Sequence, residues 1–99
     1  MPTEPEVDPE VRAEAGSLIA DLRTAGWRVV ASRYEAPVMG NWFVDLERDG
    51  RVIRLVKDRS QFTIDGPTDE LAAADLSKAF DRLSTFREAV VAWAAPQCA

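Results

Sequence analysis

Residues 41–65, NWFVDLERDGRVIRLVKDRSQFTID, carry the clearest signal of secondary structure in the chain. Apolar and polar side chains alternate along 41–47 and again along 51–57, which is the period of a β-strand with one buried face. Asp49-Gly50 stands between the two runs and is a strong signal for a hairpin turn. The two runs therefore predict a pair of antiparallel strands.

The same stretch continues into a second hairpin. Residues 57–60 favour a tight polar turn, and residues 61–65 alternate once more. The three runs predict an antiparallel meander, whose apolar face carries Trp42, Val44, Leu46, Ile53, Leu55, Phe62 and Ile64. Charged side chains occupy the opposite face, as on a solvated antiparallel sheet.

A fourth strand precedes the meander in the chain. Residues 27–34, WRVVASRY, are rich in aromatic and β-branched side chains, which favour a strand. Regular alternation places Trp27, Val29 and Ala31 on one face and Arg28, Val30, Ser32 and Tyr34 on the other. We expect this strand to complete a four-stranded sheet.

Helices are predicted before and after the strands in the chain. Residues 9–25 carry an apolar stripe at helical spacing, with Asp8 as the expected cap and Gly26 as the expected stop. The region after Pro67 also approximates a helical period and forms one helix or two. A capping box at Thr85 favours a break near Ser84 and a second helix, which we place over Phe86 to Ala95.

The order of elements predicts an α+β fold. We expect a two-layer sandwich in which an antiparallel four-stranded sheet carries the N-terminal and C-terminal helices on one face. The single domain spans 9–95. It lies between an acidic leader over 1–8, expected to be disordered, and a flexible tail over 96–99.

The composition excludes several classes of protein. The chain has 99 residues, 12 basic and 17 acidic side chains, a net charge of −5, no histidine and a single cysteine, Cys98. It therefore has no Ser-His-Asp triad, no histidine metal site and no internal disulfide. Acidity argues against a nucleic-acid partner, and no long apolar run or signal peptide indicates a membrane or export. We expect a cytoplasmic protein without a cofactor or metal.

Two groups of side chains are candidates for function in the meander. Asp45, Glu47 and Asp49 could hold a divalent cation or a water between carboxylates. Nearby arginines favour cross-strand ion pairs instead, and these are Arg48, Arg51 and Arg54. Trp42 and Phe43 are neighbours on one strand, so one of them faces the polar side, where an exposed aromatic could anchor a partner.

The polar turn over 58–61 is the third candidate. Asp58 and Ser60 can accept backbone N–H bonds and so favour the turn. Arg59 could form a forked pair with a carboxylate, either within this chain or on a partner.

The stretch from Gly40 to Asp65 resembles a pattern in small bacterial proteins. The pattern has a strand GNW-x-V-x-L, a turn, and an apolar strand that ends in Asp-Arg-Ser-Gln. Proteins with it are similar to immunity proteins of polymorphic or contact-dependent toxin systems. The resemblance implies a non-enzymatic binder that covers the active site or another essential surface of a toxin. It also implies that the fold is held by Gly40, Asn41, Trp42, Asp58, Arg59, Ser60 and Gln61.

Three functions remain open at this point. The first is a protein-interaction module like an immunity protein, whose negative charge speeds association with a basic toxin. The second is a homodimeric structural or regulatory domain, and the third is a carboxylate-based hydrolase. The possible interface residues are Gly40, Asn41, Trp42, Asp45, Glu47, Asp58, Arg59, Ser60 and Gln61.

Overall fold

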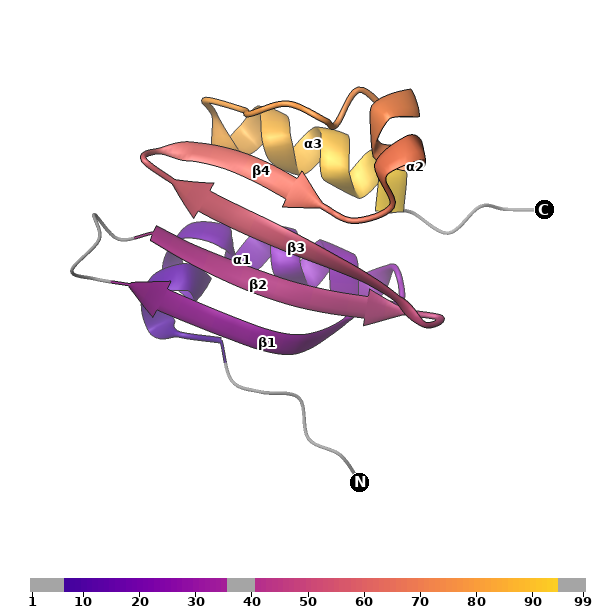
Figure 1. Cartoon of the computed structure of the whole chain (residues 1–99). Helices are drawn as coiled ribbons and strands as arrows, with labels where there is room; N and C mark the ends of the chain where they lie inside the picture. The colour runs from indigo at the N-terminus through magenta and orange to yellow at the C-terminus, as the bar shows by residue number, and fades with distance from the viewer. Residues whose placement is uncertain (1–6, 36–40, 95–99) are drawn as a thin grey trace.

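The computed structural model describes residues 7–35 and 41–94 (Figure 1). Its elements are α1 (Pro9–Thr24), β1 (Arg28–Glu35), β2 (Asn41–Arg48), β3 (Arg51–Asp58), β4 (Gln61–Asp65), α2 (Thr68–Ala73) and α3 (Leu83–Ala94). The strands form one antiparallel sheet in the order β1-β2-β3-β4. The prediction of an α+β fold with this sheet and with helices at both ends is confirmed. Gly40, Cys98 and the tail 96–99 lie outside the described residues.

One face of the sheet forms the core. Every side chain predicted for the apolar face of the meander is buried, in one cluster with buried side chains of α1 and α3 such as Leu18, Leu22, Phe86 and Val90. Each fully buried Val, Leu or Phe contributes roughly 1.5–3 kcal/mol. Figure 1 shows α1 and α3 behind the sheet, so within the described residues both helices cover the same face.

Both hairpins of the meander close through two-residue turns. The turn residues are Asp49-Gly50, at φ 53° and 78°, and Arg59-Ser60, at φ 53° and 65°. Two positive φ angles define the type I′ turn, whose twist matches that of the strands. Glycine adopts this backbone freely, whereas another residue brings its Cβ against a carbonyl oxygen at roughly 1–2 kcal/mol. The Arg59-Ser60 turn therefore carries the greater strain of the two, because neither of its residues is glycine.

β1 departs from regular alternation at Val30. Its pairing with β2 shifts there, so Val30 forms a β-bulge. Beyond the bulge Ala31 lies opposite an outward-facing residue of β2, whereas Tyr34 lies opposite Trp42 and packs against the core. The predicted facing of Ala31, Ser32 and Tyr34 is wrong, because one inserted residue exchanges the two faces of a strand.

The C-terminal region holds two helices, but the break between them lies earlier than predicted. Residues 74–82 separate α2 from α3 and are not helical. There Phe80 exchanges two backbone hydrogen bonds of 2.8 Å with Phe62 and forms an isolated bridge to β4. The predicted break near Ser84 is wrong, because the edge of β4 takes the backbone of Phe80 out of any helix. Thr85 lies within α3 and does not cap it.

α1 matches the predicted span to within one residue, but its cap differs. Asp8 precedes the helix, and its side chain makes no capping hydrogen bond, so that prediction is wrong. Gly26 follows the helix at φ 96°. Of the predicted leader over 1–8, Val7 is described and is buried in the core, and residues 1–6 lie outside the described residues.

Candidate functional site

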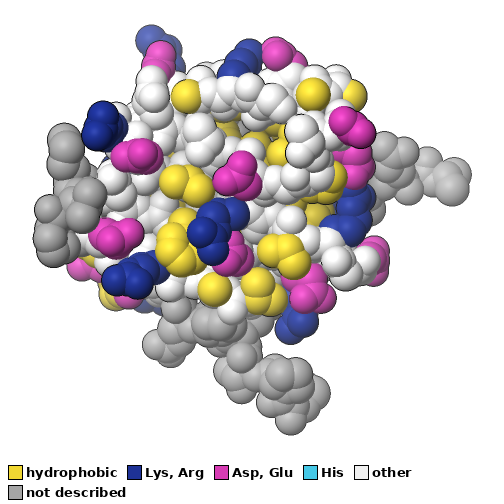
Figure 2. Space-filling view, viewed as in Figure 1, with side chains coloured by type: hydrophobic (Ala, Val, Ile, Leu, Met, Phe, Trp, Pro, Cys, Tyr) yellow, Lys and Arg dark blue, Asp and Glu magenta, His cyan; other side chains and the backbone are white. Residues whose placement is uncertain are grey.

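The sheet face opposite the helices carries a mixed patch of apolar and charged side chains. β2 contributes Phe43, Asp45 and Glu47, and β3 contributes Val52, Arg54 and Val56; these residues form the sheet-face patch. Val52 is 51% exposed, and no other large apolar side chain in the described part of the chain is classed as exposed. Figure 2 shows hydrophobic side chains lying around charged ones over this face.

Arg54 organises the centre of the patch. Its Nε and Nη2 donate to Oδ1 and Oδ2 of Asp45 at 2.7 and 3.0 Å, and its guanidinium lies 4.1 Å from the centroid of the Phe43 ring. The hydrogen bonds to Asp45 raise the pKa of Arg54, against the effect of burial and with the help of the charges of Asp45 and Asp65. A forked ion pair and a cation–π contact thus hold three side chains in one arrangement.

Two of the three carboxylates that the sequence singled out, Asp45 and Glu47, are held in separate ion pairs. Asp45 pairs with Arg54, as expected, and Glu47 accepts from Arg28 of β1 at 3.3 Å. Asp49 lies in the type I′ turn. Within residues 7–35 and 41–94, no group of three or more acidic or cysteine side chains is placed to hold a metal ion. The patch therefore offers no pair of free carboxylates for acid–base chemistry.

Arg48 and Arg51, the other two arginines expected to pair with these carboxylates, contact other groups. Arg51 pairs with Glu70 of α2. Arg48 donates from Nη1 to the backbone carbonyls of Ala25 at 2.9 Å and Ala94 at 2.7 Å. The prediction that Arg48 and Arg51 pair with the β2 carboxylates is wrong, because each reaches a helix that the local sequence does not reveal.

A hollow of about 340 Å³ adjoins the patch. It is lined by Glu35 of β1, by Asn41, Trp42 and Phe43 of β2, and by Arg54, Val56, Lys57 and Asp58 of β3. Phe43 and Val56 supply apolar surface, and Glu35 and Asp58 supply carboxylates. No cationic side chain of the described residues forms an ion pair with either of these two carboxylates.

Asn41 braces the strained turn from the neighbouring strand. Its Nδ2 donates to Oδ1 of Asp58 at 3.0 Å, and its Oδ1 accepts from the backbone N–H of Arg59 at 3.1 Å. Gln61, just past the turn, donates to Asp81 at 3.2 Å. The structure thus brings together Asn41, Asp58 and Arg59 beside the hollow, and it leaves the Arg59 and Ser60 side chains exposed.

Trp42 belongs to the core, and the aromatic on the polar face is Phe43. Trp42 is 2% exposed, and its Nε1 donates to Glu14 of α1 at 2.9 Å. Lys57 Nζ donates to both oxygens of the same carboxylate at 2.9 Å. Burial opposes the charge on Glu14, but the hydrogen bonds from Trp42 and Lys57 outweigh it and hold the pKa of Glu14 below its ordinary value.

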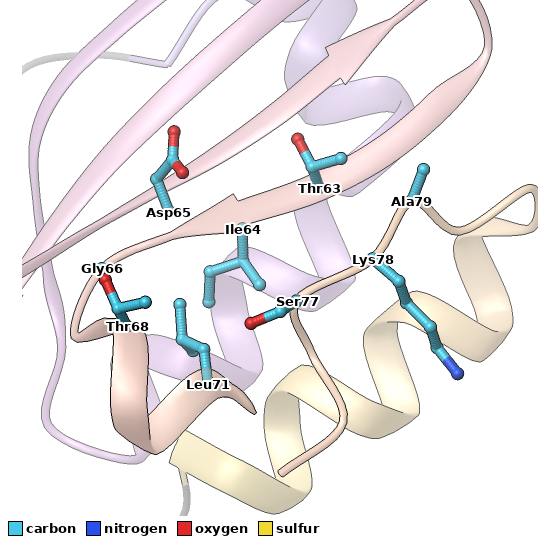
Figure 3. Close-up of a pocket in the computed structure, with 9 residues that line it drawn as sticks. All are labelled: Thr63, Ile64, Asp65, Gly66, Thr68, Leu71, Ser77, Lys78 and Ala79. Carbon is cyan, nitrogen blue, oxygen red and sulfur yellow. The ribbon is translucent and has the colours of Figure 1, made fainter. Parts of the chain in front are cut away.

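A larger hollow, of about 410 Å³, lies beside β4 (Figure 3). Ile64 and Leu71 point toward each other there, whereas Asp65 and Lys78 point away. Lys78 instead pairs with Asp75 at 2.8 Å. This hollow has no converging charged groups, so the sheet-face patch and its adjoining hollow form the better candidate site.

Comparisons with protein-family models, curated proteins and solved structures give no match. No helix in residues 7–35 or 41–94 combines the length and the apolar character needed to cross a bilayer.

Proposed function

We propose that this chain is a non-enzymatic protein-interaction module, like an immunity protein, that binds and neutralises a basic bacterial toxin in the cytoplasm. The sheet-face patch is the binding surface. The observation that carries the proposal is the fixed Phe43–Arg54–Asp45 cluster on a sheet face that no described helix covers.

The composition of the patch suits a protein interface. Aromatic and arginine side chains dominate binding energy at interfaces, and they do so when neighbouring contacts exclude water. Asp45 holds Arg54, and Arg54 lies over the ring of Phe43, so a partner orders little that is not ordered in the free chain. Val52 and Val56 supply apolar area beside them.

The charge of the chain supports a basic partner. The chain carries a net charge of −5, and Glu35 and Asp58 line the hollow without a cation of the described residues paired to them. Opposite charge steers a partner toward the patch and raises the association rate. Because salt screens exposed charges, we expect binding to weaken as ionic strength rises.

A pull-down tests this function, with the native chain as bait and the product of the neighbouring gene as prey. The double variant Phe43→Ser/Val52→Thr removes apolar surface from the patch and leaves every core side chain in place. We expect the native chain to retain the prey and the double variant to bind about tenfold more weakly or worse.

The control for this experiment is Ala92→Ser, at an exposed position of α3 away from the sheet. It should bind like the native chain, and circular dichroism should show all three proteins folded. The function is wrong if the native chain does not bind the prey, or if the patch variant binds it as well as the native chain does.

A further inference from the structure

We infer that the β3–β4 turn presents the Arg59 side chain to a carboxylate on the protein partner. This inference rests on the proposed function, because it adds a second contact to the same binding surface.

The two hairpins of the meander provide an internal comparison. Both turns place two successive residues at positive φ. The first turn uses Asp49-Gly50, which this geometry favours, whereas the second uses Arg59-Ser60. The second turn therefore keeps two side chains that its own backbone disfavours. Strained backbone that the surrounding structure enforces is typical of binding and catalytic sites.

Contacts within the described chain do not account for the Arg59 side chain. Its backbone N–H donates to Asn41, a bond that any residue except proline could make. Asp58, its neighbour in sequence, accepts from Asn41 instead. The guanidinium is exposed, and no carboxylate in residues 7–35 or 41–94 forms an ion pair with it.

The turn adds area to a sheet face that is smaller than a typical protein interface. Three strands of eight residues and one of five, at about 3.3 Å per residue and spaced about 4.8 Å apart, give a four-stranded face of roughly 400–500 Å². A standard interface buries about 800 Å² on each partner. Asn41 and Asp58 line the hollow beside the patch and also hold the turn, so Arg59 extends the same surface.

The chemistry of arginine identifies the group that it meets. A guanidinium fork matches the two oxygens of a carboxylate, and the turn fixes the point at which the Arg59 side chain leaves the backbone. A basic protein still carries carboxylates, and one of them opposite Arg59 sets the register of the partner on the sheet. Asn41 is the positioning residue for this contact.

The test is Arg59→Asn, because asparagine tolerates positive φ and lacks the guanidinium. We expect the Tm of the variant to rise by about 2–8 °C as the strain is relieved. We expect its affinity for the product of the neighbouring gene to fall about tenfold or more. The matched control is Asp49→Asn in the first turn, which should leave the affinity unchanged.

The outcomes separate this inference from the proposed function. If the native chain binds and Arg59→Asn binds with the same Kd, the inference is overturned and the function stands. A Tm below that of the native chain shows that the turn is not strained, and this also overturns the inference. If the native chain does not bind, both are overturned.

Discussion

Glu14 fastens α1 to the sheet through two donors, the indole of Trp42 and the ammonium of Lys57. The pKa of Glu14 in the folded chain lies below its ordinary value of 4.5. At a pH between the folded and the ordinary pKa, the unfolded chain therefore binds more protons than the folded chain. The carboxylate therefore stabilises the fold above the ordinary pKa. This contribution is lost as the pH falls through the lowered folded pKa.

Replacing Glu14 by glutamine tests this contact. The amide keeps one acceptor oxygen but loses the charge, so we expect the free energy of unfolding to fall by about 1 kcal/mol at pH 7, allowing for the partial exposure of the pair. Urea denaturation should show that the native chain and Glu14→Gln differ less in their free energy of unfolding at pH 3 than at pH 7. Glu88→Gln, at an exposed position of α3, is the control and should leave the free energy of unfolding unchanged at both pH values. A difference that is independent of pH would contradict the role of the charge.

The residue scale also shows which parts of the site could be predicted. The Asp45–Arg54 pair could be predicted from the sequence, because a two-residue hairpin fixes which residues face each other across its strands. The brace from Asn41 to the Arg59 turn could not, because it depends on the reach of one side chain between the ends of two strands. The role of Glu14 was hidden for a similar reason, since only tertiary packing places α1 beside Lys57.

At the scale of secondary structure, Arg48 ties the ends of two helices to β2. It donates to the carbonyl of Ala25, the C-cap of α1, and to that of Ala94 in the last turn of α3. Its guanidinium also lies 4.8 Å from the Trp27 ring centroid. The final carbonyls of a helix lack donors within the helix and lie at the negative end of its dipole. One cation therefore satisfies two helix ends.

Arg48→Met keeps the apolar stem and removes the donors. We expect the free energy of unfolding to fall by about 2–3 kcal/mol, because two carbonyls lose a charged donor. Amide hydrogen exchange should quicken in the last turn of α3. The matched control is Arg51→Met, whose exposed pair with Glu70 should be worth about 0.5 kcal/mol or less. Equal losses in the two variants would contradict a clamping role for Arg48.

The elements differ in how far local sequence could predict them. The meander was predictable because burial of alternate side chains and a two-residue turn are local properties. The bulge at Val30 was not, since alternating polarity on a short strand does not reveal an inserted residue. Residues 74–82 were misread as helical because their apolar spacing suits a helix. Phe80 pairs with Phe62 of β4, and this pairing keeps residues 74–82 from forming a helix. Because the two residues are distant in the chain, local sequence does not reveal the contact.

At the level of the whole molecule, the two faces of the one sheet have different surroundings. The face toward α1 and α3 holds the core, and the opposite face carries the Phe43–Arg54–Asp45 cluster. Under the proposed function, substitutions on the outer face should therefore change binding while the core stays intact. This separation is what a stable scaffold for a protein-binding surface requires.

Amide chemical-shift mapping of the isotope-labelled chain, titrated with the product of the neighbouring gene, tests most directly whether the uncovered sheet face binds. We expect the largest shifts at Phe43, Arg54 and Val56, continuing to Arg59, while the exposed residues of α3 stay unchanged. Shifts concentrated on the helices, or an unchanged spectrum at saturating partner, would contradict the assignment of the binding surface to the sheet.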